Sequence, residues 1–296
     1  MIAVIVNPVA GSGLAQTIGQ KVEALLLQRG VAHAMLYTER AGHATELARA
    51  AAAQGADTVL SVGGDGTLNE TAAGLVGSKA ALGIIPAGTG NDFVKAAGTP
   101  RKWDEALEYV LNNPAHPLDT GMVNDTFFIN VCGAGFDVMV LDYANRAKKH
   151  VRGIWPYLYG VFAAIRAFKP FEMTVEIGDK LKLHGKYMIC TIANGTTIGG
   201  GIPILPIANV EDGLLDIMVV DTVPSWRIVF YLPAILGGTL LKKKISHHYR
   251  ADRCTLTSHN MRLNMDGEIV PMESARFTVQ PASLLAHWPG SIAAQV

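Results

Sequence analysis

Apolar and polar positions follow one pattern before Gly121 and another pattern after it. In the first part, short runs that are apolar throughout are separated by longer runs with helical spacing. The predicted strands are 3–6, 32–37, 58–62, 82–85 and 116–119, and the predicted helices are 14–29, 44–54, 68–76, 92–97 and 103–112. Strands that are apolar on both faces and alternate with helices predict a parallel sheet covered by helices.

Strand-like runs dominate the second part of the chain. The predicted strands are 127–131, 173–177, 187–193, 215–220, 253–257, 261–265 and 275–280, and the predicted helical stretches are 137–168 and 225–236. This pattern predicts a mostly antiparallel, β-rich domain with helical excursions. We therefore expect an α/β domain over 1–121 and a β-rich domain over 122–287, with the tail 288–296 free to pack back onto the first.

Composition limits the classes of protein that remain. Hydrophobic residues make up 49% of the chain and charged residues 17%, so a substantial core is expected. Lys+Arg and Asp+Glu both number 25, so no long-range positive field attracts nucleic acid, and we expect no nucleic-acid partner. The start of the chain predicts no signal peptide. Cys132, Cys190 and Cys254 lie far apart in apolar surroundings, which predicts buried free thiols and a cytoplasmic location.

Three glycine-rich segments each follow a predicted strand and precede a predicted helix. They are Asn7-Pro8-Val9-Ala10-Gly11-Ser12-Gly13, Ser61-Val62-Gly63-Gly64-Asp65-Gly66-Thr67-Leu68-Asn69-Glu70 and Pro86-Ala87-Gly88-Thr89-Gly90-Asn91-Asp92-Phe93. The first, alone, is equally consistent with an ordinary turn. In a parallel sheet, however, all three emerge at the carboxyl ends of the strands, where ligands bind. Glycines there allow backbone amides to approach phosphate, so the three loops predict a nucleotide site, and none has the P-loop pattern.

Asp65 is the unusual residue of the second loop. A carboxylate repels phosphate unless a cation lies between them, so an anion cradle that contains Asp65 indicates Mg²⁺. Thr67 and Glu70 have the spacing of a capping box for the following helix. In the third loop, Asn91 is expected to be a helix N-cap, with Asp92 in the first turn.

In order and spacing, these motifs resemble the diacylglycerol kinase catalytic domain family, which includes YegS-like lipid kinases, ceramide kinases and sphingosine kinases. The resemblance continues through Gly133-Ala134-Gly135-Phe136-Asp137, Gly199-Gly200-Gly201, Asp212-Gly213-Leu214-Leu215-Asp216 and Asp266-Gly267-Glu268, and so covers nearly the whole chain. It implies an N-terminal domain like those of NAD kinase and phosphofructokinase, a C-terminal antiparallel β-sandwich, and ATP in a cleft between them. The compact length looks bacterial.

The resemblance also implies a set of site residues. Nucleotide contacts would come from Asn7, Pro8, Val9, Ala10, Gly11, Thr38, Gly63, Gly64, Asp65, Gly66, Thr67, Leu68, Asn69 and Thr89. Glu268 would sit at the proton-acceptor position of the family. A structural Mg²⁺ would use Asn209, Asp212 and Leu214, with backbone carbonyls as ligands from Asn209 and Leu214.

Several roles remain open at this level. Either Glu268 or Asp266 accepts the proton of the acceptor hydroxyl, and Asp65 either holds the Mg²⁺ network or contacts that hydroxyl. Without the resemblance, Asp266-Gly267 and Asp212-Gly213 would each be interpreted as a plain turn, and Asp137 as the N-cap of the following helix.

The predicted acceptor is a hydroxyl of a membrane lipid, with diacylglycerol favoured, so the protein would act transiently at the inner face of the membrane. The apolar run 228–241 is too short to span a bilayer and is followed by Lys242, Lys243 and Lys244. These suit either a lipid surface or a solvated helix end. The aromatic stretch 154–159 could line a lipid groove or belong to the core. The alternative functions are an NAD kinase-like enzyme and a non-catalytic nucleotide or lipid sensor on the same fold. A homodimer is compatible with each of these functions.

Overall fold

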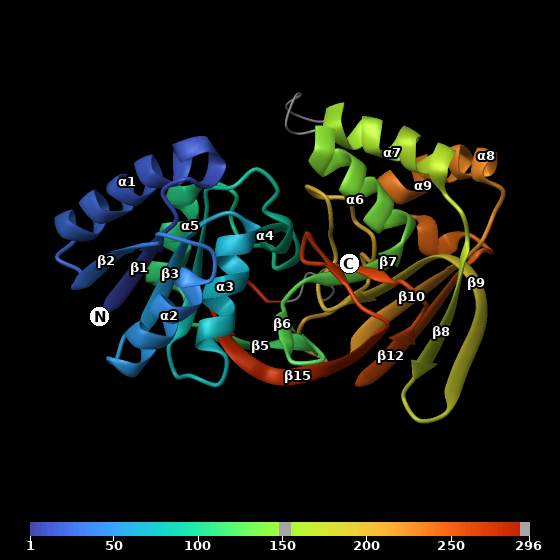
Figure 1. Cartoon of the computed structure of the whole chain (residues 1–296). Coiled ribbons are helices and arrows are strands. Elements are labelled where there is room, and N and C mark those ends of the chain that lie inside the picture. Colours follow the sequence, from blue (N-terminus) through green and yellow to red (C-terminus); the bar gives the residue numbers. More distant parts are fainter. Residues whose placement is uncertain (148–154, 291–296) are drawn as a thin grey trace. The chain divides into compact units, whose positions relative to one another are not determined.

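The computed structural model describes residues 1–147 and 155–290, which form two compact units (Figure 1). Unit 1 consists of Met1–Thr120, Asn209–Gly213 and the chain from Gln280, and unit 2 consists of Gly121–Ala208 and Leu214–Val279. The units thus differ from the expected boundaries at two places. Asn209–Gly213 belongs to unit 1, and the chain returns to unit 1 at Gln280, inside strand β15 (Ser274–Ala286), where no break in composition marks the change.

The sheet of unit 1 is parallel, and four of the five strands predicted for it belong to it. The fifth, 116–119, lies in β5 (His116–Val123), which pairs instead with β15 and with β6 (Thr126–Phe128). The strands of the sheet are β1 (Ile2–Val6), β2 (His33–Tyr37), β3 (Thr58–Gly63) and β4 (Ala81–Pro86), in the order β2-β1-β3-β4. The end of β15 adds to β4 through the parallel pair of Ala286 with Leu82. Every residue of β3 and β4 is buried, which explains their uninterrupted apolar sequence.

Helices cover both faces of this sheet. The helices are α1 (Leu14–Gln28), α2 (His43–Ala53), α3 (Asp65–Leu75), α4 (Asp92–Ala96) and α5 (Trp103–Asn112), with the 3-10 turn η1 (Ala10–Gly13) before α1. One core joins α1 and α5 to β1, β3 and β4 through Val22, Leu26, Leu60, Val62 and Leu107, among others. α2 and α3 pack together so closely that a Cβ on Gly74 would lie 2.5 Å from the carbonyl oxygen of Thr45.

Unit 2 is built on antiparallel strands, as predicted. Its strands are the end of β5 (His116–Val123), β6 (Thr126–Phe128), β7 (Val131–Gly135), β8 (Phe171–Ile177), β9 (Leu181–Ala193), β10 (Leu215–Asp221), β11 (Ser246–Ala251), β12 (Arg253–Thr257), β13 (Arg262–Met265), β14 (Glu268–Pro271) and the start of β15. The main path is β14-β13-β7-β9-β8-β12-β15. The long strand β9 pairs with β8 near its start, with β7 near its end and with β10 on its other side, which lets the sheet fold over a core.

A second layer of unit 2 is helical. It contains α6 (Phe136–Ala147), α7 (Trp155–Ala167), α8 (Ser225–Ile228), η2 (Val229–Tyr231), α9 (Leu232–Leu236) and η3 (Leu240–Lys242), packed on β7, β9 and β10. The helical stretch predicted over 137–168 therefore comprises two helices, and its residues 148–154 lie outside the described residues. The predicted strand 127–131 overlaps β6 but reaches only the first residue of β7, which is rich in glycine. Strands β11 and β14 were not predicted, because β11 is rich in polar residues and β14 is short.

All three cysteines are buried and free, as predicted. Burial raises the pKa of the Cys132 and Cys190 thiols well above the ordinary value, so these thiols stay protonated. Within the described residues, no helix has the length and apolar character that crossing a bilayer requires.

Candidate nucleotide and phosphoryl-transfer site

The three glycine-rich loops meet at the carboxyl edge of the unit 1 sheet. A Cβ on Gly88 would overlap the Cα of Gly64, and a Cβ on Gly11 would overlap the carbonyl oxygen of Ala87. The backbone amide of Ala87 also donates to the carbonyl of Gly63, at 2.8 Å. The loops after β1, β3 and β4 are therefore in direct contact, and glycine is required because any side chain would separate them.

Asn7 connects the first loop to helix α3. Its Nδ2 donates to Oγ1 of Thr67 at 3.0 Å, and its Oδ1 accepts from the amide of Val9 at 3.3 Å. Thr67 is not the helix cap that the sequence predicted, because α3 begins at Asp65 and extended Gly64 is the N-cap residue. The side chain of Thr67 is thus available to fix the loop after β1.

Glu70 also differs from the prediction. Its carboxylate accepts from the amides of Gly42 and Ala44, at 2.8 and 3.1 Å, and so caps the start of α2. The expected capping box between Thr67 and Glu70 was wrong. The reason is tertiary: the packing of α2 against α3 brings two unpaired helix amides to Glu70, where they stabilise its negative charge.

Asp65 holds the third loop. Its Oδ1 accepts from the amide of Asp92 at 2.6 Å, at the first residue of α4. Asn91 occupies the N-cap position as predicted, but it has a left-handed backbone and its Nδ2 donates to the carbonyl of Gly88 at 2.9 Å. The capping carboxylate therefore comes from Asp65. Lys95, which was not predicted, closes the same loop by donating to the carbonyl of Gly90 at 2.8 Å.

The other predicted nucleotide residues lie on the same edge, because each follows a parallel strand. Thr38 follows β2, and its amide donates to the carbonyl of Val6 at 3.0 Å. Val9, Gly66 and Thr89 are exposed, whereas Leu68 is buried in the core and can offer a ligand only its backbone. The half-buried residues are Asn7, Pro8, Ala10, Gly11, Thr38, Gly64, Asp65 and Asn69, and Gly63 and Thr67 are buried.

Asp119 secures the segment that contains two of the predicted metal positions. This buried carboxylate accepts from the amide of Gly213 at 2.6 Å and from the amide of Ala282 at 2.7 Å. Sequence reasoning gave Asp119 no role, although a single carboxylate at the end of an apolar strand was a usable signal. It fixes Asn209–Gly213 in unit 1 by joining three distant parts of the chain.

The predicted metal positions are Asn209, Asp212 and Leu214, and the structure shows a contact for the side chain of Asn209. Oδ1 of Asn209 accepts from the amide of Glu211 at 3.1 Å, which commits this side chain to its own loop. Asp212 belongs to unit 1, and Leu214 is the first residue of the next segment of unit 2. In the described part of the chain, no group of three or more His, Cys, Asp or Glu side chains forms a metal cluster. Any metal here would therefore depend on Asp212 and backbone oxygens.

The Asp266-Gly267-Glu268 motif forms the turn between β13 and β14 in unit 2. Asp266 and Gly267 both have positive φ, at 48° and 99°, and Met265 pairs with Glu268 across the turn. Asp266 accepts from the amides of Ile129, Asn130 and Val131, at 2.8, 3.1 and 2.8 Å. Three amide donors hold Asp266 as an inward-facing carboxylate, whereas Glu268 is exposed.

Half-buried Asp137 lies next to this turn, where it is hydrogen-bonded to Asn264 and its Oδ1 is shielded from solvent. It is in the first turn of α6, which begins at Phe136, so its predicted role as N-cap was wrong. Burial raises the pKa of Asp137 to about 6, although hydrogen bonds from the amide of Val138 and the side chain of Asn264 favour the charged form. Asn264 in turn accepts from the amide of Gly267 at 3.0 Å. The carboxyl of Asp137 thus supports the turn that presents Glu268.

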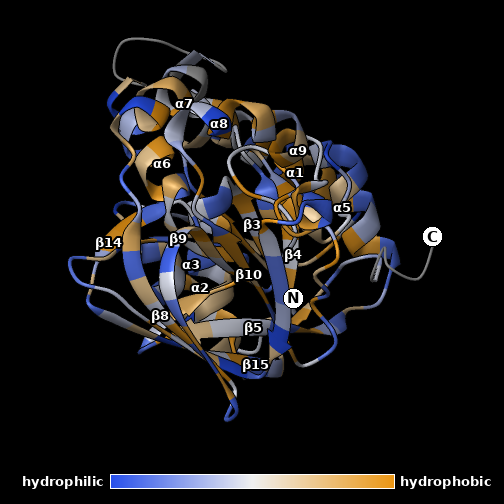
Figure 2. Ribbon diagram, turned by 90° about the vertical axis from the view of Figure 1, so that its right-hand side faces the viewer, coloured by the Kyte–Doolittle hydropathy of each residue, from blue (hydrophilic) through white to orange (hydrophobic). Residues whose placement is uncertain are grey.

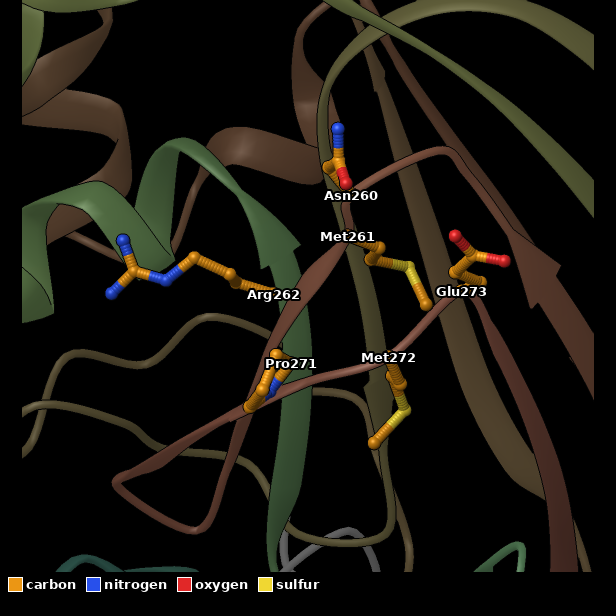
Figure 3. A pocket seen from close by; sticks show the side chains of 6 residues that line it. All are labelled: Asn260, Met261, Arg262, Pro271, Met272 and Glu273. Atoms are coloured by element: carbon orange, nitrogen blue, oxygen red, sulfur yellow. The ribbon is translucent and has the colours of Figure 1, made fainter.

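A surface hollow of about 320 Å³ lies at the opposite end of the β13–β14 hairpin. It is lined by Asn260, Met261, Arg262, Pro271, Met272 and Glu273 (Figure 3). Figure 3 shows the two methionine side chains on one side of the hairpin and Arg262 extending from the other. The pair of Arg262 with Pro271 is at the open end of the ladder and Glu268 is at the turn, so the hollow is separate from the predicted proton acceptor.

Comparisons with known proteins agree with this arrangement. The profile described as "Diacylglycerol kinase catalytic domain" matches residues 1–123, and the "YegS C-terminal NAD kinase beta sandwich-like domain" matches residues 130–286. The chain is 31% identical to a Bacillus subtilis protein named "Diacylglycerol kinase", over 93% of this chain and 91% of the relative. It is 34% identical to a Pseudomonas putida protein named "Probable lipid kinase YegS-like", over 85% and 84%.

The chain belongs to the diacylglycerol kinase family. A solved structure from Bacillus anthracis, assigned as a diacylglycerol kinase, matches 97% of both chains with a TM-score of 0.80 and 25% identity. The resemblance and the fold class inferred from the sequence are thus confirmed. As a member of this family, the chain is a phosphotransferase of the lipid kinase class, for which ATP is the implied phosphate donor.

Proposed function

We propose that this kinase uses Mg²⁺ and transfers the γ-phosphate of ATP to the hydroxyl of a membrane lipid, with diacylglycerol as the favoured acceptor. The observation that carries the proposal is the contact of three glycine-rich loops at the carboxyl edge of the unit 1 sheet. Family membership supports the reaction class, and the name of the Bacillus subtilis relative favours diacylglycerol. Residues of the site would bind the phosphates of ATP, hold the metal ion and remove the proton of the acceptor hydroxyl.

Phosphate binding is assigned to the backbone of unit 1. Helix α3 begins at Asp65 without a side-chain cap, so the amides of its first turn can donate to phosphate oxygens. Asn7 and Thr67 hold the first loop against this helix, and Asp65 holds the loop that carries Thr89. These contacts fix the loops before ATP arrives, which reduces the entropy cost of ordering the site.

Metal binding is assigned to two places on chemical grounds. Half-buried Asp65 offers a carboxylate beside the phosphate cradle, and Asp212 offers one in the segment fixed by Asp119, with carbonyls of Asn209 and Leu214. Oxygen donors of this kind suit Mg²⁺. When bound, the ion would neutralise phosphate charge.

Glu268 is the proposed proton acceptor. Of the two carboxylates on the turn, Asp266 already accepts three backbone amides, while Glu268 is exposed at the first residue of β14. We therefore assign Asp266 to positioning the turn and Glu268 to removing the proton of the lipid hydroxyl. A general base of this kind contributes about 10²- to 10⁴-fold to the rate.

The test is transfer of label from γ-labelled ATP with Mg²⁺ to lipids in mixed micelles. The panel contains diacylglycerol, phosphatidylglycerol, a sphingoid base and an isoprenoid alcohol, with NAD as a soluble acceptor. Glu268→Gln should lower kcat by about 10²- to 10⁴-fold with little change in Tm, and Glu273→Gln, another exposed carboxylate of unit 2, should not.

Three outcomes contradict parts of the proposal. Label in NAD but in no lipid would indicate an NAD kinase-like enzyme. ATP binding without transfer to any acceptor would favour a non-catalytic sensor. Transfer that survives complete removal of Mg²⁺ by a chelator would exclude the metal requirement.

A further inference from the structure

Helix α7 presents aromatic side chains outward. Trp155, Tyr159 and Phe162 are 66%, 57% and 63% exposed, and their spacing of four and three residues places them on one face. The opposite face packs on α6 through small residues: a Cβ on Gly160 would lie 2.5 Å from the carbonyl of Val140, and Ala164 is fully buried. The core therefore takes small residues of α7 and leaves Trp155, Tyr159 and Phe162 largely in solvent.

The neighbouring segment, α8 and η2, also exposes large aromatic side chains. Trp226 and Phe230 are 62% and 69% exposed and form an edge-to-face pair with ring centroids 6.2 Å apart, while Ile228 between them is fully buried. Oγ of Ser225 donates to the carbonyl of Phe168, which joins α8 to the end of α7. Figures 1 and 2 both show α7 and α8 side by side in the helical layer of unit 2.

These five side chains form what we call the aromatic surface: Trp155, Tyr159, Phe162, Trp226 and Phe230. Within the described residues, they are five of the six strongly exposed aromatic side chains, the sixth being Tyr37 in unit 1. Exposed apolar residues are ordinary when scattered, but their concentration on adjoining helices indicates an interaction surface.

The charge of the two segments that carry the aromatic surface indicates which kind of partner suits it. Segments 155–169 and 222–245 contain no Asp or Glu, although the whole chain has equal numbers of acidic and basic residues. Their cations are Arg166, Lys169, Arg227, Lys242, Lys243 and Lys244, and all six are exposed. The guanidinium of Arg227 lies over the ring of Trp226, at 5.0 Å from its centroid. Aromatic rings next to cations, without any acid, match the boundary between acyl chains and anionic headgroups.

We propose that the aromatic surface inserts into the interfacial region of an anionic bilayer, with the six cations of 155–169 and 222–245 against its headgroups. The inference rests on the proposed function, because a lipid acceptor requires the kinase to meet a bilayer. An acidic protein would also complement the cations. A bilayer explains more, because it holds the proposed lipid acceptor and because the five exposed rings can insert into it.

The experiment is cosedimentation of the full chain with vesicles of phosphatidylcholine, with and without phosphatidylglycerol. The wild type should bind the anionic vesicles and not the neutral ones, and Trp fluorescence should shift to the blue on binding. Trp226→Ala with Phe230→Ala should weaken binding at least ten-fold, from the apolar area lost. Leu27→Ala, which removes a residue 65% exposed on α1 of unit 1, should leave binding unchanged.

The lysines have a matched control in the same unit. Changing Lys242, Lys243 and Lys244 to Gln should weaken binding by about 100-fold, since each surface cation contributes about five-fold. Changing Lys180, Lys182 and Lys186 to Gln removes the same charge from exposed positions on the β8–β9 hairpin and should have little effect. Equal losses in the two triple variants would overturn the inference, because binding would then depend only on net charge.

Activity on a short-chain diacylglycerol dissolved below its micelle concentration separates the two proposals. If the kinase phosphorylates this soluble acceptor but binds no vesicles, or binds equally well without the aromatic surface, the docking inference fails and the proposed function stands. If the aromatic surface binds vesicles while no lipid is phosphorylated in any form, docking stands and the proposed function fails.

Discussion

Replacing Asp137 with Asn tests whether unit 2 carries an unfavourable, poorly solvated charge at neutral pH. Asp137 is half-buried as a residue, but its Oδ1 is shielded from solvent and has no hydrogen-bond partner within the described residues. Burial raises the pKa of Asp137 from 3.8 to about 6 in the folded chain. The difference of about two pKa units corresponds to about 3 kcal/mol, which is the cost of ionising this group in the folded state.

The sign follows from proton binding. Between pH 3.8 and about 6, the folded chain holds a proton on Asp137 that the unfolded chain has released. The stability contributed by the protonated group is therefore fully present below pH 3.8 and is lost as the pH rises through about 6. The amide introduced by Asp137→Asn remains neutral at every pH and keeps a carbonyl that can accept from Asn264, so the variant should gain up to about 3 kcal/mol on the wild type by pH 8.

The assay is amide hydrogen exchange of β7 and β13 from pH 5 to pH 8, corrected for the intrinsic exchange rate. Local opening is preferable to global unfolding here, because a chain of two units need not unfold in one step. Asp142→Asn on the same helix is the matched control. Burial favours a higher pKa for Asp142, but hydrogen bonds and charge from Arg262 and Arg146 outweigh it and lower the pKa. Its replacement should therefore destabilise unit 2 above about pH 4.

At pH 8 we expect Asp137→Asn to stabilise unit 2 and Asp142→Asn to destabilise it. If Asp137→Asn and the wild type showed the same pH dependence, the burial of Asp137 would not perturb its ionisation. If both variants destabilised unit 2 equally at pH 8, hydrogen bonding at Asp137 would outweigh its desolvation.

Three further predictions concern contacts between distant parts of the chain. Asp266→Ala should destabilise unit 2 by on the order of 3 kcal/mol, because the amides of 129–131 lose their acceptor, and faster exchange at those amides would show it; unchanged exchange would mean that water replaces the carboxylate. Glu70→Ala should lower the free energy of unfolding of unit 1 by about 1 to 2 kcal/mol through the lost cap of α2, measured by urea denaturation, and a neutral result would contradict the capping role. Gly88→Ala should raise the Kd for ATP at least ten-fold in calorimetry, because its Cβ would separate the loops after β3 and β4; unaltered affinity would show that loop contact is not needed.

The local parts of this protein could be predicted from its sequence. Strands β3 and β4 are apolar throughout because both of their faces are covered, and this pattern indicated the parallel sheet. The glycines at 11, 64 and 88 showed that backbone must approach backbone, and the Asp266-Gly267 pair predicted a tight turn. Each of these signals depends on the backbone conformations that a residue type itself allows, whatever its tertiary contacts.

The partners of the polar side chains were decided only by the tertiary structure. Asp65 accepts from Asp92, Glu70 caps α2 instead of its own helix, and Asp266 accepts from amides up to 137 positions away. The sequence did not show which groups Asp119 and Asp137 would contact, because a carboxylate can serve as a cap, an anchor or a shielded acid depending on which backbone amides folding brings to it. The aromatic surface has the same origin: helical spacing places Trp155, Tyr159 and Phe162 on one face, but only the packing of Gly160 and Ala164 on α6 turns that face toward solvent.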